Sequence, residues 1–575
     1  MRGAVENADK YAGLFWGTHS PMQIVVSAPG SDQDTSLNQT RKPVVIETLA
    51  VLTGQSANAE NFGQNPLMPA YGLFPADQFV ITNGSCADCD ALPQALWYFR
   101  GETIAVPKKA ELLAGFARGL SVYDDLAAWA KATPIGSALA YPPLVWIGSR
   151  DFVRDALLSG DGRAIKTASG ELALQLVPKL PLNGSYFDSS SVAYFDGLPI
   201  KIRGNQQGDS FVARTFWPQS FRLPEAPAGV ALSADPEALC NWIRRQPKGG
   251  AQSPFSVESV WRHPASSGPR IGQPIVGLML NGAQGDDDEA HGGHFALMTG
   301  RVGAEGAMDE WLVNNFYTLD SESEKGIIAA PVPLDNYLGD LNSGQAWYRP
   351  SYLLVATLKD GRTAVHLQSA LSRVYNQFYR HQFAYRHASA NCAGISVITS
   401  RTLGWQVPER GPESWLKATI GLPLLAIKNK SLRKGKGTFD YLTEDQTKLY
   451  PAAAFEEMGA DLLKLASGQT GRSLSEFERL LADDIEEILL VRVPQLPSSR
   501  AWGDFPAENS VEYTARVPKD LAEQKIIPVP PRPFPDELRD PQTPAEPPLR
   551  SDYAAAVWGL VFLALILFIL RRLLA

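Results

Sequence analysis

Cys392 is the residue whose sequence surroundings point most directly to chemistry. It lies in the segment ASANCAGISVITSR, where Ser389 or Asn391 can cap a helix, so we expect Cys392 in the first helical turn. Unpaired N–H groups and the positive end of the helix dipole lower the pKa of a thiol there, and the thiolate is the nucleophilic form of cysteine. The backbone N–H of Cys392 is also a natural donor to an oxyanion.

The partners that such a thiol needs occur earlier in the chain. The apolar run 275–280 leads through the loop NGAQGDDDEAHGG into a strand, 294–302, that opens with His294. A second strand, 310–317, carries Asn314 and Asn315 and can pair with the first as a hairpin. An imidazole can hold a thiolate as an ion pair and later protonate the leaving group, while an amide or carboxylate fixes the ring. All three kinds of group are therefore present.

The order of these motifs resembles the circularly permuted NlpC/P60, papain-like superfamily, which includes the lecithin:retinol acyltransferase-like enzymes. The resemblance rests on GGHFALMTG, WLVNN and YRHASANC, and it covers about a fifth of the chain. It implies that Cys392 is the nucleophile, His294 the base and Asn314 the residue that orients the histidine. Members of this group cleave or transfer acyl groups at amide or ester bonds, and several acyltransferase-like members are held to membranes by a C-terminal helix.

The chain also departs from the pattern of that superfamily. Gly394 and Ile395 replace the bulkier residues that usually follow the cysteine, and Asn315 competes with Asn314 for the third position. The resemblance implies a hydrolase or acyltransferase that needs no cofactor and no metal. Its substrate class stays open among phospholipid, lipidated protein, isopeptide and peptidoglycan stem peptide.

Two other functions are compatible with the same residues. In the Asp286–His294 loop, four consecutive carboxylates precede His291 and His294, and such a mixture of ligands can bind a divalent metal. A run of carboxylates is also typical of a solvated loop. Alternatively, the protein is a non-catalytic membrane-tethered scaffold, in which Cys392 is a buried core thiol and His294 a capping residue.

The remaining cysteines allow several interpretations. Cys86 and Cys89 form a C-x-x-C pair that fits structural thiols, a disulfide or redox pair, or half of a zinc site whose other ligands are distant. Cys240 lies in the helical segment PEALCNWIRR, where we expect a small buried hydrophobic residue. With four cysteines in 575 residues, folding has to depend on packing rather than on disulfides.

Composition excludes some classes of protein. The chain is 45% hydrophobic and 20% charged, which is typical of globular domains and not of disordered proteins. Its net charge of −8 provides no positive field to attract phosphates, so we expect no nucleic acid partner. The length predicts three or four globular units.

The C-terminal end carries the signature of a membrane anchor. Residues 553–570, YAAAVWGLVFLALILFIL, form an uncharged stretch long enough to span a bilayer as one helix, with the bilayer as the partner. The Pro-rich segment 521–552 before it favours an extended stalk. Arg571 and Arg572 balance Arg539 and Arg550, so the positive-inside rule gives no orientation. Since no leader peptide precedes the chain, we expect the bulk to be cytoplasmic.

The rest of the chain predicts a multidomain α+β protein. We divide it into an α+β domain of unknown role at 1–225, the permuted papain-like domain at 226–410 and a helical region at 411–520. Local patterns predict helices over 150–158 and 474–489 and a strand over 191–202. A run of basic residues, 428–436, follows the apolar stretch 418–427 and fits either contact with anionic headgroups or a solvated surface loop.

Overall fold

The fold is that of a computed structural model, which describes residues 69–499 with short gaps, and residues 506, 515 and 534–539 beyond them. The gaps are residues 88, 90, 109–119, 137–140, 181–186, 248–251, 267–269, 283–292, 320–327, 383–384, 387–389 and 429. The described chain is a mixture of helices and sheets, which confirms the α+β class.

An eight-stranded sheet organises the larger of two compact units, whose described residues are 69–413 and 444–539. Its strand order is β11-β12-β18-β17-β13-β14-β15-β16, and the pairs are antiparallel except for β11 with β12. The strands are β11 (Ala228–Gly229), β12 (Ser256–Arg262), β13 (Pro274–Asn281), β14 (His294–Arg301), β15 (Leu312–Asn315), β16 (Ala330–Pro333), β17 (Ser351–Leu358) and β18 (Ile485–Val493). Strands β13 and β17 are buried on both faces, as expected for strands covered by layers on each side.

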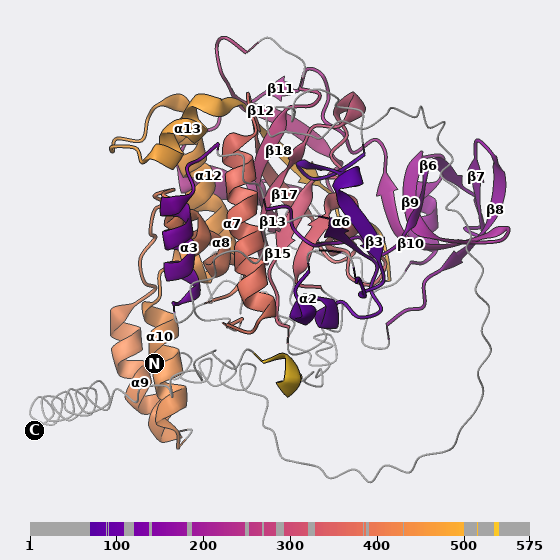
Figure 1. The fold of residues 1–575 in the computed structure, drawn as a ribbon. Helices are drawn as coiled ribbons and strands as arrows, with labels where there is room; N and C mark the ends of the chain where they lie inside the picture. Colours follow the sequence, from indigo (N-terminus) through magenta and orange to yellow (C-terminus); the bar gives the residue numbers. More distant parts are fainter. Residues whose placement is uncertain are drawn as a thin grey trace, which may run out of the picture. The chain divides into compact units, whose positions relative to one another are not determined.

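Helices cover one face of this sheet. The helices are α3 (Val122–Ala132), α5 (Pro236–Arg244), α7 (Arg362–Tyr379), α8 (Cys392–Thr402), α11 (Gln446–Leu449), α12 (Pro451–Ser467) and α13 (Glu476–Asp484). Gly459 of α12 packs so closely on α5 and β17 that an added Cβ would lie 2.7 Å from Leu239 and 3.1 Å from Leu354. Figure 1 shows α7, α8 and α12 together on this side, and α8 contacts both of the others.

On the opposite face, α6 (Leu334–Gly339) contacts β15 and β16, and β5 (Val145–Trp146) contacts β16. The other amino-terminal elements are β1 (Ala70–Tyr71), β2 (Phe74–Pro75), β3 (Phe79–Thr82), β4 (Ile104–Pro107) and α2 (Pro93–Tyr98), which contacts α7. The short helix η5 (Gln345–Trp347) follows α6 and contacts it. A closed five-stranded barrel follows, with β6 (Asp151–Leu158), β7 (Ala164–Thr167), β8 (Gly170–Leu176), α4 (Ser189–Phe195), β9 (Ile200–Gln207) and β10 (Ser210–Pro218). Strand β10 contacts α6, which joins the barrel to the sheet (Figure 1).

Buried charges fill the junction between barrel and sheet. Lys201 of β9 forms ion pairs with Asp309 and, at 2.8 Å, with Asp335 of α6, and Arg203 reaches Asp335 at 2.6 Å. Arg154 of β6 adds an ion pair of 3.2 Å to Asp309. Burial alone would raise the pKa of Asp309, but Lys201 and Arg154 outweigh it and the net pKa is lowered. Each buried charge is thus compensated by its neighbours.

The second compact unit contains a helical hairpin of α9 (Trp415–Lys428) and α10 (Leu432–Thr443). The run 428–436 therefore begins at the end of one helix, crosses a turn and enters the next helix. The interpretation of this run as a surface loop is wrong for the residues that lie in α10. The other interpretation, contact with headgroups, stays a prediction.

Several local predictions hold. The strands predicted at 294–302 and 310–317 are β14 and β15, which pair antiparallel with Leu297 opposite Asn314. Asn391 caps α8 and Cys392 is its first residue. Cys240 is a buried thiol in α5, as predicted.

Three local predictions are wrong. The helix predicted at 150–158 is strand β6, because closure of the barrel overrides local propensity. The predicted strand 191–202 begins as α4, capped by Asp188, and becomes β9 only from Ile200. The helix predicted over 474–489 ends at Asp484, and strand β18 starts at Ile485 between β12 and β17. The sheet therefore includes residues from both sides of the predicted boundary between 410 and 411.

Two other features bear on the predictions. Cys86 and Cys89 are joined in a disulfide, which selects one of the alternatives for the C-x-x-C pair. Among the described residues, no helix has the length and apolar character needed to cross a bilayer. The predicted anchor at 553–570, the stalk except for residues 534–539, and the Asp286–His294 loop except for Gly293 and His294 lie outside the described residues.

Candidate active site

Cys392 is fixed at the start of α8 by its neighbours on both sides. The side chain of Asn391 accepts a hydrogen bond from the N–H of Gly394 at 2.8 Å, which caps the helix. The same side chain donates to the carbonyl of Leu449 at 2.8 Å and so ties this end of α8 to α11. Cys392 is 2% exposed.

The hydroxyl side chains of α8 are satisfied within the helix. The hydroxyl of Ser396 donates to the carbonyl of Cys392 at 2.8 Å, and Thr399 and Ser400 make the same bond four residues back. These bonds explain how a helix rich in Ser and Thr can be buried between α7 and α12.

The backbone N–H of Cys392 points at a phenol. It donates to the hydroxyl of Tyr385 over 3.4 Å, which is at the long end of the range for a hydrogen bond. The hydroxyl oxygen therefore occupies the position that an oxyanion bound to this N–H would take. The ring of Tyr385 lies 5.7 Å from that of Tyr317, two residues past the end of β15.

His294 opens β14 and lies opposite Asn281, the last residue of β13. The glycine before it is required, because Gly293 has φ +89° and a Cβ there would lie 1.9 Å from the carbonyl oxygen of Asn281. His294 is 1% exposed, and its ring centroid is 6.4 Å from that of Tyr337 in α6. The imidazole therefore lies at the start of β14 on the face that packs on α6, whereas Cys392 begins α8, which lies with α7 and α12 on the other face of the sheet.

Asn281 is a polar neighbour of His294 that sequence reasoning did not identify. Its amide donates to the hydroxyl of Ser351 at 2.7 Å and accepts from the hydroxyl of Tyr337 at 2.7 Å. Directly opposed residues of an antiparallel pair have side chains on the same face, about 5 Å apart at Cβ. The signal in the sequence is its position as the polar residue that ends the apolar run IVGLMLN.

Asn314 makes different contacts from those that the resemblance implies. It exchanges hydrogen bonds of 2.9 and 3.1 Å with Gln368 of α7, and it donates to the carbonyl of Leu297 at 3.2 Å. Thr299 also donates to Gln368, at 2.5 Å. Asn314 is paired with Leu297, so the side chains of these two residues lie on the same face of the sheet. Leu297 follows His294 by an odd number of residues along β14, so the side chains of Asn314 and His294 lie on opposite faces. Among the described residues, the hydrogen-bond partners of the Asn314 side chain are Gln368 and Leu297, and not His294.

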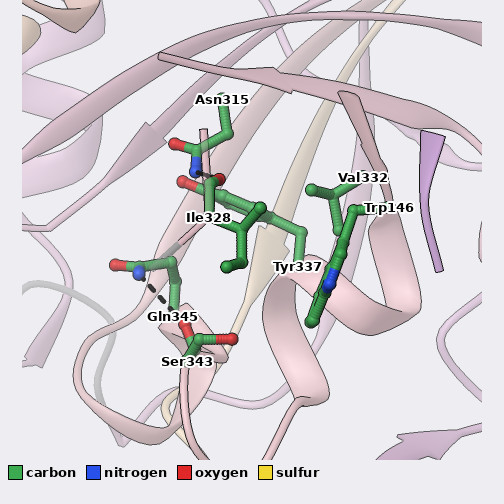
Figure 2. A pocket seen from close by; sticks show the side chains of 7 residues that line it. All are labelled: Trp146, Asn315, Ile328, Val332, Tyr337, Ser343 and Gln345. Carbon is green, nitrogen blue, oxygen red and sulfur yellow. Dashed lines mark hydrogen bonds between the residues drawn. The ribbon is translucent and has the colours of Figure 1, made fainter. Parts of the chain in front are cut away.

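Asn315 shares the face of His294 and lines a small pocket there. Figure 2 shows its amide directed at the backbone of Ile328, whose carbonyl accepts a bond of 2.6 Å. Tyr337 lines the same pocket and connects it to the neighbourhood of His294. The lining residues are Trp146, Asn315, Ile328, Val332, Tyr337, Ser343 and Gln345.

Buried tyrosines of α7 border this end of the sheet. Tyr375 stacks on Phe316 with centroids 4.1 Å apart, and the hydroxyl of Tyr379 donates to the carbonyl of Ala329 at 2.9 Å. Burial raises the pKa of both tyrosines well above 10, so their hydroxyls stay protonated. They supply packing and neutral hydrogen bonds rather than acid–base chemistry.

The described residues give no support to a metal site, since they contain no group of three or more His, Cys, Asp or Glu side chains suited to hold an ion. Comparison of the chain with known protein families, with curated proteins and with solved structures finds no match. The chemistry proposed for this site therefore rests on its own residues.

Proposed function

We propose that the protein is a thiol-dependent acyl hydrolase or acyltransferase with Cys392 as its nucleophile. The observation that supports this most is the place of Cys392 as the first residue of α8, capped by Asn391, with its N–H on Tyr385. The ring of Tyr385 contacts Tyr317, which follows β15 at the end of the sheet where β14 begins with His294. A thiol in that position is favoured as a thiolate by the helix dipole.

The proposed reaction starts when the sulfur of Cys392 attacks the carbonyl carbon of an ester or amide. The substrate oxygen replaces the hydroxyl of Tyr385 at the N–H of Cys392, because that hydrogen bond is long and easily exchanged. The bond to the leaving group breaks, and the leaving group takes the proton that the imidazole of His294 received from the thiol. For this transfer the ring has to reach the sulfur around the start of β14, since α8 lies on the other face of the sheet. Water or a second acceptor then attacks the thioester and releases the acyl group.

In this proposal His294 is oriented by residues on the same face of the sheet as His294, and not by Asn314. Asn281 and Tyr337 are the neighbours in place to limit movement of the ring. Asn314 holds β15 against α7 through Gln368 and is a structural residue in this proposal.

We further propose that the predicted helix at 553–570 anchors the enzyme to a membrane. An anchored enzyme would meet substrates that are lipids or lipid-linked. This part of the proposal rests on the sequence of that stretch.

A non-catalytic scaffold is the second candidate, and one observation favours it. Cys392 and His294 are 2% and 1% exposed, as in a packed core. In that case the thiol is a structural part of the junction between α8 and the sheet.

The two candidates differ in whether an acyl group can be trapped on the enzyme. The full chain is mixed with p-nitrophenyl esters of short and long fatty acids and examined by intact and peptide mass spectrometry. The enzyme proposal expects one acyl group on the Cys392 peptide, which is absent in Cys392→Ser. Loss of the adduct in His294→Ala, with a normal unfolding transition, supports the role of the imidazole. No adduct with any chain length supports the scaffold.

A further inference from the structure

The α9–α10 hairpin exposes apolar side chains in an unusual concentration. Of the eleven large hydrophobic side chains that are exposed in the described part of the chain, six belong to this hairpin. Leu416 is 67% exposed, Ile427 63% and Trp415 60%, whereas the five elsewhere are 37% to 46% exposed. Such a concentration is typical of an interaction surface rather than of scattered exposure.

The exposed apolar residues form a stripe on one helix. Leu416, Ile420, Leu424 and Ile427 follow one another at spacings of four, four and three, which places them on one side of α9. We call these four residues the α9 stripe.

The other side of α9 is used for packing within the hairpin. Leu422 and Leu425 are buried, and Gly435 of α10 lies so near that an added Cβ would come within 2.5 Å of the carbonyl oxygen of Leu422. The Cβ of Ala426 would lie 2.8 Å from a Cβ added at Gly435. The contacts between the two helices therefore leave the α9 stripe outside the hairpin.

The hairpin is strongly basic in an acidic protein. Residues 414–443 contain six Lys or Arg and one acidic residue, Asp440, a net charge of +5, while the whole chain has −8. Lys417 and Lys428 are exposed and lie on one flank of the α9 stripe, and Lys430 is exposed in the turn. Asp440 is paired with Lys436 at 2.7 Å.

We propose that the α9 stripe docks into the interface of an anionic lipid bilayer. An amphipathic helix inserts its apolar side chains at the boundary of headgroups and acyl chains, and its lysines extend to the phosphates. Negative lipid headgroups complement the +5 charge of the hairpin, which a neutral apolar protein groove would not. The placement of lysines beside the stripe fits a planar, negatively charged surface.

This docking is independent of the thiol chemistry and of the predicted anchor. If the helix at 553–570 tethers the chain, the hairpin is a second contact that sets how the chain meets the membrane. The two contacts together would bind far more firmly than either one alone.

The test is hydrogen–deuterium exchange of the full chain in detergent, on phosphatidylcholine vesicles and on vesicles that also contain phosphatidylserine. Because an anchor would act on both kinds of vesicle, their difference isolates the hairpin. We expect amide exchange over residues 415–430 to slow by about tenfold or more on phosphatidylserine vesicles only, since docking suppresses local opening. The double variant Leu416→Gln, Ile427→Gln should abolish the slowing, whereas Ile271→Gln, an exposed residue outside the hairpin, should not.

Two results would overturn the proposal. Equal protection in detergent and on both vesicles would mean that residues 553–570 or a second copy of the chain cover the α9 stripe. Equal exchange on the two vesicles, with no dependence on Lys428→Gln, would mean that anionic lipid is not the partner. Since all the substituted side chains are exposed, loss of folding does not complicate either result.

Discussion

The barrel junction and the sheet end that holds Cys392 both bury polar groups, but they compensate them differently. At the junction, Lys201, Arg203, Asp309 and Asp335 form ion pairs within the protein, and the two aspartates are 5% exposed or less. At the sheet end, the N–H of Cys392 donates to the phenol of Tyr385 over a long bond, and His294 lies near Tyr337 and opposite Asn281.

This difference is one reason why we propose chemistry at the sheet end and not at the junction. A carboxylate whose oxygens are held by Lys and Arg is not available as a base, and removing one partner leaves an uncompensated charge. Neutral groups joined by a long hydrogen bond can exchange that bond for a substrate. The junction is therefore suited to a structural role, and the proposed reaction belongs to the sheet end.

The largest effect is expected at the junction. Asp335→Ala would leave Lys201 and Arg203 without their shared carboxylate and lower the free energy of unfolding by about 3–5 kcal/mol. Urea titration measures this loss. Asp536→Ala is the matched control, because the Arg539–Asp536 pair is exposed and should have no measurable effect. A similar small change in both variants would mean that the buried cluster does not hold the barrel in place.

The next largest effect is a pH dependence of stability that arises from His366, which lies between α3 and α7. His366 stacks on Trp129 at 4.9 Å, and burial lowers its pKa from 6.5 to about 4. His366 therefore takes up a proton more readily in the unfolded chain than in the fold. Its contribution to the free energy of unfolding is complete above pH 6.5 and is lost as the pH falls from 6.5 to 4. The loss amounts to about 3 kcal/mol at its limit.

His366→Phe keeps an aromatic ring and removes the titration. Between pH 6.5 and 4, the free energy of unfolding of this variant should fall by about 3 kcal/mol less than that of the unchanged protein. Parallel pH profiles for the two proteins would show that His366 is protonated with its ordinary pKa in the fold.

The third effect separates Asn314 from His294 within the site region. Asn314→Ala removes the partner of Gln368 in the core, and we expect a loss of about 1–3 kcal/mol in unfolding free energy. The alkylation rate of Cys392 should not change, because Asn314 faces α7 rather than His294. A strong drop in that rate with little loss of stability would restore the orienting role that the resemblance implies.

Sequence reasoning predicted the local elements around the site better than their arrangement. The cap at Asn391 and the strand that opens at His294 are determined by neighbouring residues, and both were predictable. The face on which Asn314 or Asn315 lies depends on strand register, where a shift of one residue reverses the side. Periodicity does not predict that Asn281 lies opposite His294, nor that Asn314 forms hydrogen bonds with Gln368.

The errors elsewhere have the same cause. In residues 474–489, the apolar spacing fits a helix until Ile485, but the continuous run to Val493 is buried in the sheet. Short apolar runs fit a buried strand as well as a helix, and only the partners β12 and β17 decide. The barrel strand β6 likewise depends on distant partners in β7 and β9.

The reactivity of Cys392 relative to that of Cys240 is the most direct test of whether Cys392 is a nucleophile. Both thiols lie in helices, form no disulfide and are 2% and 4% exposed, so burial alone predicts equal, slow reaction. Native protein is treated with iodoacetamide at neutral pH, and the two peptides are quantified by mass spectrometry over time. We predict that Cys392 reacts about tenfold faster or more and that His294→Ala removes the difference. Equal, slow labelling of both thiols would contradict it.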